Sequence, residues 1–167
     1  MAIASTLLPE FDHEMAGCRK TLERVPAARF DFKPHPKSFS LGQLANHLAS
    51  VPTWLVTMLQ TTELDFVDPE TAKRMPLPAA TTETLVAQFD QGVKAARAAL
   101  AGASDTDMMA VWTGRSGGQV VLSFPRTAVY RGFILNHMIH HRAQLTVYLR
   151  LLGLPVPALY GPSADEM

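Results

Sequence analysis

The sequence predicts an all-α fold: a four-helix bundle with a long crossover connection between its second and third helices and a small hairpin-like insertion before its fourth. Apolar residues recur at intervals of three and four along four separate stretches, which places them on one face of an α-helix. Ser or Thr stands where several of these stretches begin, and Pro or Gly where they end, as is typical of helix termini. The chain has 167 residues, which suits a single domain over residues 1–167 with its own core.

Each expected helix has its own boundary signals. Pro26 cannot continue the first helix, and Ser40 with Gln43 forms a capping box that opens the second. Gly153 follows the last apolar turn of the fourth, as expected for a helix C-terminus. The expected helices cover residues 3–24, the stretch that follows Ser40, Thr81 or Thr82 to about Gly102, and Ser123 or Pro125 to Gly153.

Two connections are longer than simple turns. Residues 61–80 are rich in Thr, Asp and Pro, and a crossover loop or a short helical piece would fit there. Residues 103–124 contain two β-prone runs around a Gly-rich turn, which predicts a small hairpin. This turn matches G-x-S-x-G around Ser116, but a nucleophile elbow needs a helix directly after it. Val120 to Leu122 follow instead, so Ser116 is not expected to be a nucleophile.

The composition excludes several classes of function. Apolar residues make up 47% of the chain, charged residues 18%, and the net charge is zero, so neither a nucleic-acid partner nor binding to an acidic membrane surface is expected. The single cysteine, Cys18, excludes an internal disulfide and a Cys-rich zinc site. We see no signal peptide and no apolar run long enough to span a membrane. These features lead us to expect a cytoplasmic protein.

Three histidines lie on apolar helix faces and form the candidate site. His137 and His141 are one turn apart, in the middle of a stripe that we expect to face the core. His47 lies in a second such stripe, on the second helix. A histidine on an apolar face can be a core residue with a hydrogen-bonded ring, but neutral imidazoles that meet in a dry place can also share a metal ion. Spacing alone hardly separates His140 from His141, because these residues lie about 60° and 40° to either side of His137.

A metal on His47, His137 and His141 would keep open coordination positions, which is typical of catalytic or ligand-binding sites rather than structural ones. Other metal sites fit less well. The H-E-x-x-H motif fails because Met138 stands where the glutamate should be. A di-iron bundle fails because it needs two Glu-x-x-His motifs and the chain has only one, Glu10 to His13.

The chain resembles the DinB/YfiT-like proteins over nearly its whole length. The residues that carry this resemblance are Asn46-His47-Leu48, Asn136-His137, His140-His141-Arg142-Ala143-Gln144-Leu145, Tyr148 to Gly153, and Tyr160-Gly161-Pro162. Ala143 departs from the glycine that is common in the family. The resemblance implies a four-helix bundle, often a homodimer, that holds a divalent metal on three histidines, and it favours His141 over His140 as a ligand. It also implies kinship to thiol-dependent transferases and to a maleylpyruvate isomerase.

Two functions follow from this sequence. The first is a metal-dependent enzyme, transferase- or hydrolase-like, in which a small molecule or a low-molecular-weight thiol takes the open metal position. The second is a non-enzymatic metal- or ligand-binding stress-response protein. Zn or Ni is expected first, with Fe, Mn or Co as alternatives. No general base can be named; His13, Gln43 and Gln144 are the polar residues expected nearest the site.

A homodimer is expected to use the outer side of the fourth helix. Leu135 and Ile139 lie about 160° from His137 on a helical wheel, on the side where an isolated bundle would show polar residues. The alternative is that a segment of the same chain covers them, and the connection 61–80 is the obvious candidate.

Overall fold

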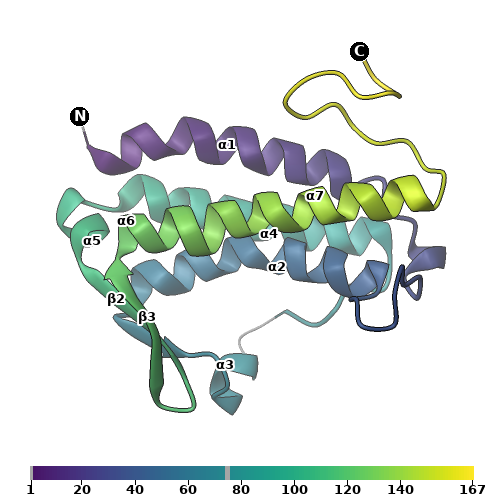
Figure 1. Cartoon of the computed structure of the whole chain (residues 1–167). Coiled ribbons are helices and arrows are strands. Elements are labelled where there is room, and N and C mark those ends of the chain that lie inside the picture. Colours follow the sequence, from purple (N-terminus) through teal and green to yellow (C-terminus); the bar gives the residue numbers. More distant parts are fainter. Residues whose placement is uncertain (1, 74–75) are drawn as a thin grey trace.

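The computed structural model describes residues 2–73 and 76–167 and shows a mostly helical chain with a small three-stranded sheet (Figure 1). The predicted all-α class is therefore correct only in part. The long helices are α1 (Ile3–Leu22), α2 (Leu41–Gln60), α4 (Thr82–Gly102) and α7 (Asn136–Leu151). The shorter helical pieces are η1 (Ala27–Arg29), α3 (Pro69–Lys73), α5 (Asp105–Met109), α6 (Arg126–Val129) and the π-helical segment η2 (Tyr130–Leu135).

The long helices lie side by side and enclose the core (Figure 1). Helix α2 packs along α4 and α7, and α1 packs against α4 and α7. Phe11, Leu44, Phe89, Leu145 and Leu149 come from these four helices and are each at most 1% exposed. Burial of such side chains stabilises the fold by about 1.5–3 kcal/mol each. Within residues 2–73 and 76–167, no helix is both long enough and apolar enough to cross a lipid bilayer.

Two predicted helix starts, those of α2 and α4, are confirmed by their caps. The Gln43 amide donates to Ser40 Oγ at 3.2 Å, and Gln43 Oε1 accepts from the Ser40 amide at 2.8 Å. Thr81 caps α4 in the same way with Thr84. Each box satisfies two backbone donors that the helix itself cannot pair.

The sheet joins the two long connections of the chain. Strand β2 (Val111–Ser116) pairs antiparallel with β3 (Gln119–Pro125), which confirms the predicted hairpin, and parallel with β1 (Glu63–Asp65). Gly117 and Gly118 have φ values of +59° and +80°, a conformation that favours glycine. Their amides donate to the Asp65 carboxylate at 3.0 and 2.7 Å. The connection 61–80 therefore contains a strand, which the sequence did not reveal, and the short helix α3.

The predicted fourth helix is interrupted by η2, and this interruption overturns the expected back face. A π-helix needs more residues per turn than an α-helix, so a single helical wheel does not describe residues 126–151. Leu135 is fully buried and Ile139 packs partly buried against the core. The prediction that these two residues form an exposed dimer surface is therefore wrong.

The core-facing residues of α7 are Met138, Arg142, Leu145 and Leu149, each at most 2% exposed. They lie roughly 100° around the helix from His137. The expectation that the stripe around His137 faces the core is thus correct only in part: Tyr130, Ile134 and Tyr148 of that stripe are buried, whereas His137 and His141 are only partly buried. The histidines of α7 lie on its flank, beside α2.

One buried ion pair joins α7 to α1. Arg142 is 2% exposed and Glu14 is 5% exposed, and Arg142 Nη2 lies 2.8 Å from Glu14 Oε2. Tyr160, in the C-terminal segment, donates its hydroxyl to the same carboxylate at 2.7 Å. Gly17 makes room for the guanidinium, since a Cβ there would lie 2.5 Å from Arg142 Nη1. The pair is well bonded, as a buried charge must be.

Candidate metal centre

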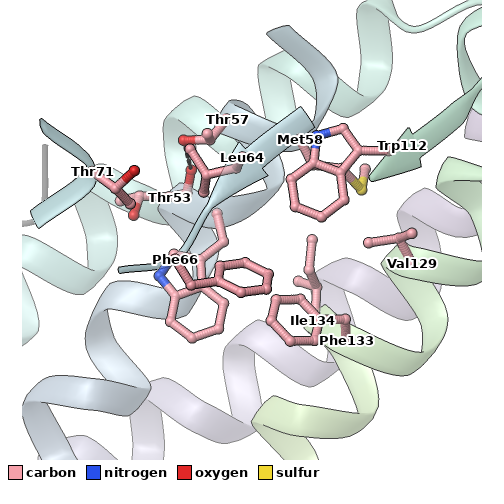
Figure 2. A pocket seen from close by; sticks show the side chains of 11 residues that line it. Thr53, Thr57, Met58, Leu64, Phe66, Thr71, Trp112, Val129, Phe133 and Ile134 are labelled. Carbon is pink, nitrogen blue, oxygen red and sulfur yellow. Dashed lines mark hydrogen bonds between the residues drawn. The ribbon is translucent and has the colours of Figure 1, made fainter. Parts of the chain in front are cut away.

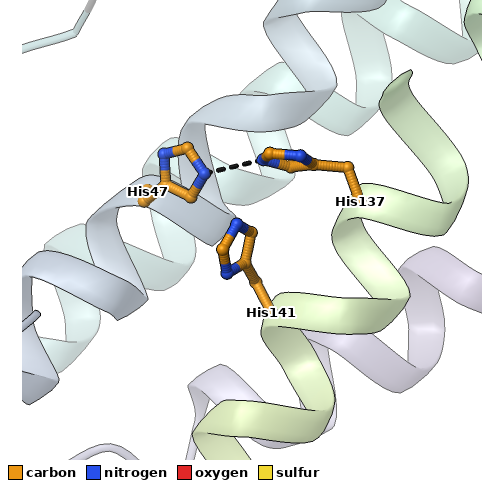
Figure 3. A group of neighbouring side chains, drawn as sticks. All are labelled: His47, His137 and His141. Carbon is orange, nitrogen blue, oxygen red and sulfur yellow. Dashed lines mark hydrogen bonds between the residues drawn. The ribbon is translucent and has the colours of Figure 1, made fainter. Parts of the chain in front are cut away.

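Three histidines from two helices converge at the flank between α2 and α7. His47 comes from α2, and His137 and His141 come from successive turns of α7; their rings point toward one another (Figure 3). One ligand nitrogen from each ring can be chosen so that all three lie within 4.8 Å of one another. Nε2 of His47 and Nε2 of His137 are 2.8 Å apart. The sequence thus identified three residues that the fold does bring together.

The hydrogen bonds of the cluster define where its lone pairs lie. Nδ1 of His141 is 2.8 Å from Oε1 of Gln144. An amide oxygen only accepts hydrogen bonds, so Nδ1 carries the proton and Nε2 of His141 keeps its lone pair. A hydrogen-bond acceptor on the far nitrogen is the usual arrangement for a metal-binding histidine.

Burial keeps these rings neutral. It lowers the pKa of His47 to about 4, and the nearby His141 adds to the effect. Burial also lowers the pKa of His137 to about 4, with further contributions from His141, His47 and His140. The pKa of His141 is lowered by burial as well, against the hydrogen bond with Gln144, which raises it. Neutral imidazole is the form that ligates metals.

The donor set fits a divalent metal ion. Two nitrogens on one tetrahedral zinc ion stand about 3.3 Å apart, since each Zn–N bond is about 2.0–2.1 Å long. The Nε2 atoms of His47 and His137 are 2.8 Å apart. These two atoms would need to move apart by about half an ångström to match the spacing of two zinc ligands. Such a displacement lies within the reach of small side-chain rotations.

The other polar residues that the sequence suggested take different places. His140 is exposed and does not belong to the cluster, although its ring centroid lies 5.0 Å from that of His141. Gln43 uses its side chain in the cap of α2. His13 lies beside Tyr160, with ring centroids 6.1 Å apart. Among the three nearby candidates, only Gln144 is bonded to the cluster.

A cavity of about 410 Å³ lies next to the histidines (Figure 2). Its walls include the aromatic rings of Trp54, Phe66, Trp112 and Phe133. Two of these rings also border the histidine cluster: Trp54 and Phe133 have centroids 5.3 and 5.9 Å from that of His137. The sequence did not reveal this cavity, because its walls come from segments that lie far apart in the chain.

Comparison with known proteins identifies a family for this chain. The sequence profile of the DinB family matches residues 3–167. A stretch of 34 residues is 50% identical to the uncharacterized protein YrdA of Bacillus subtilis strain 168, and it spans 20% of this chain and 20% of that protein.

Two crystal structures have a similar fold. A DinB-like protein of Bacillus cereus ATCC 10987 aligns with a TM-score of 0.71 at 21% identity, covering 95% of this chain and 98% of the other. The DinB-like protein YjoA of Bacillus subtilis aligns with a TM-score of 0.70 at 14% identity, covering 92% and 96%.

Proposed function

The chain belongs to the DinB family, and from this premise we propose that it binds one divalent metal ion through His47, His137 and His141. The observation that carries the proposal is the convergence of three neutral imidazoles from two helices on one point. Zn or Ni is proposed first, because imidazole suits both ions, and Fe, Co or Mn are the alternatives.

We further propose that the site belongs to a metal-dependent enzyme acting on a small molecule, with a low-molecular-weight thiol as co-substrate. Among the described residues, the metal-binding group contains no carboxylate. Three neutral ligands leave the double positive charge uncompensated, which favours an anionic ligand such as a thiolate. When bound, the ion supplies a Lewis acid with open positions that can lower the pKa of a water or thiol.

The protein's own residues contribute orientation and exclusion of water. Gln144 holds the His141 ring in the tautomer that presents Nε2 to the cluster. Trp54 and Phe133 cover the His137 side with apolar surface, and low local polarity strengthens electrostatic interactions at the site. The alternative function, a non-enzymatic metal- or ligand-binding stress-response protein, would use the same ligands.

Elemental analysis of untagged protein tests the metal site. We expect about one metal per chain, because three converging ligands make one site. His47→Ala should lose most of the binding, whereas His35→Ala, at an exposed loop position, should keep it. Full metal content in the His47→Ala protein would contradict the triad.

Cobalt substitution tests the thiol. Titration of the cobalt-loaded protein with low-molecular-weight thiols should produce sulfur-to-cobalt charge-transfer bands in the near ultraviolet. Metal-loaded protein that shows no such bands and turns over no substrate would support the non-enzymatic alternative.

We also propose a homodimer. Leu135 is buried and cannot form its contact surface, so the dimer would use another part of α7. Val147 and Leu151 lie one turn apart on α7 and are 56% and 59% exposed, and an apolar pair of this kind is a typical contact surface. Light scattering should give a dimer for the parent and a monomer for Val147→Glu with Leu151→Glu. A monomeric parent would rule the dimer out.

A further inference from the structure

The cavity beside the histidines is chemically distinct from them. It has a volume of about 410 Å³, which lies within the usual range for small-molecule sites. Aromatic and aliphatic side chains make up most of its lining, and the described residues that line it include no charged side chain. The polar side chains of the lining are three threonines and two tryptophans. The hydrogen bonds that these groups already make within the fold decide which of them a ligand can still bond to.

The three threonine hydroxyls already donate to backbone carbonyls. Thr53 Oγ1 donates to the carbonyl of Ser50 at 2.7 Å, and Thr71 Oγ1 donates to that of Asp65 at 2.8 Å. Thr57 Oγ1 donates to the carbonyl of Thr53 at 3.4 Å. Their protons are therefore not available to a ligand, except at the expense of a bond that the fold already makes.

The two indoles differ in one respect. Nε1 of Trp112 donates to Thr61 Oγ1 at 3.1 Å. Nε1 of Trp54 is buried and has no hydrogen-bond partner among the described residues. Buried donors are rarely left unpaired, since each costs about 1–3 kcal/mol. Because Nε1 of Trp54 has almost no accessible surface and that of Trp112 is already bonded, neither indole offers its N–H to a molecule in the cavity.

Trp54 also links the cavity to the histidine cluster. Its ring lies between them, with centroids 5.4 Å from His47 and 5.3 Å from His137. Phe133, which borders the cavity as well, is stacked on Trp54 with centroids 5.6 Å apart. A molecule that occupies the cavity therefore lies against the two aromatic rings that separate it from the histidines.

We propose that this cavity binds an uncharged aromatic part of the substrate that carries no acceptor group, as in an alkylbenzene, because the described lining offers no free side-chain donor. A cavity of about 150 Å³ holds one benzene, so the observed 410 Å³ has room for about two rings. A charged group would be excluded, because it would lose its hydration without gaining a partner. That the ligand is a substrate rests on the proposed metal-dependent function; the binding itself does not require the metal.

Intrinsic fluorescence can measure occupancy directly, because the only two tryptophans of the chain both line the cavity. Metal-free protein is titrated with acetophenone, ethylbenzene and benzoate, which share a ring and differ in acceptor and charge. We expect ethylbenzene to bind roughly three- to ten-fold more tightly than acetophenone, because the acetophenone carbonyl would lose its hydration without gaining a donor. Benzoate should bind most weakly. Absent binding of both neutral compounds, or tightest binding of acetophenone or benzoate, would overturn the proposal.

Filling the cavity gives an independent test. Thr57→Phe should lower the affinity for both neutral compounds at least ten-fold by occupying their space. Thr146→Phe is the control: Thr146 is also partly buried and bonded to a carbonyl of its own helix, but does not line the cavity. Unchanged binding in Thr57→Phe would place the ligands elsewhere. Since these titrations use metal-free protein, their failure counts against the cavity alone, and absent metal in elemental analysis counts against the metal centre alone.

Discussion

Acidification should destabilise the metal-free protein through His47 and His137. Both groups have a pKa of about 4 in the folded protein, against a usual value of 6.5. Between these values the unfolded chain binds protons that the folded protein does not. The free energy of unfolding of the metal-free protein should therefore be unaffected by these two groups above about pH 6.5 and should decrease as the pH falls toward 4.

The size of the effect follows from these values. At about pH 5, a histidine with a pKa of 6.5 when unfolded and 4 when folded loses about 2 kcal/mol of stability relative to pH 8. Both rings are only partly buried, so solvent screening reduces the sum, and together they give about 2–4 kcal/mol, a substantial part of the 5–15 kcal/mol that is typical of a domain. For a chain of this length, the melting temperature should fall by on the order of 10 °C.

Thermal melts followed by circular dichroism, with a chelator present, measure this loss. The parent and His47→Asn are compared at about pH 8 and pH 5, and the variant should lose clearly less stability than the parent, because one of the groups with a lowered pKa is gone. His35→Asn, in an exposed loop, is the control and should behave as the parent. A parent without an acid-dependent loss, or a His47→Asn protein that loses as much as the parent, would refute the reasoning.

Three further predictions concern α7. His141→Ala should lose metal affinity far more than His140→Ala, measured by competition with a chromogenic chelator; a greater loss at His140 would reverse the assignment. In the same assay, Gln144→Leu should weaken binding about 10- to 100-fold, because the ring of His141 is no longer oriented, and unchanged affinity would show that Gln144 has no such role. Arg142→Met should lower the free energy of unfolding in urea by about 3–5 kcal/mol, because Glu14 stays buried without its ionic partner. A second change, Glu14→Leu, should recover part of this loss. An Arg142→Met protein as stable as the parent would contradict a stabilising role for the buried pair.

The sequence was sufficient where the signals are local. Ser40 and Thr81 mark helix starts because their side chains bond to backbone groups three residues away, and the structure shows both caps. Gly117 and Gly118 mark a turn because their backbone conformation suits glycine. His137 and His141 could be paired because one helical turn separates them, and His47 could be added because its face carries the same apolar pattern.

Only the tertiary structure determines how each helix is rotated about its axis and which distant segments contact one another. The π-helical segment over residues 130–135 turns α7 relative to a regular wheel, so Leu135 is buried and Arg142 reaches Glu14 across the core. The cavity joins Trp54 to Phe66 and Trp112, which belong to connections far away in the chain. No local spacing encodes such meetings, because they arise from the burial of apolar surface that is non-directional and sums over the whole chain.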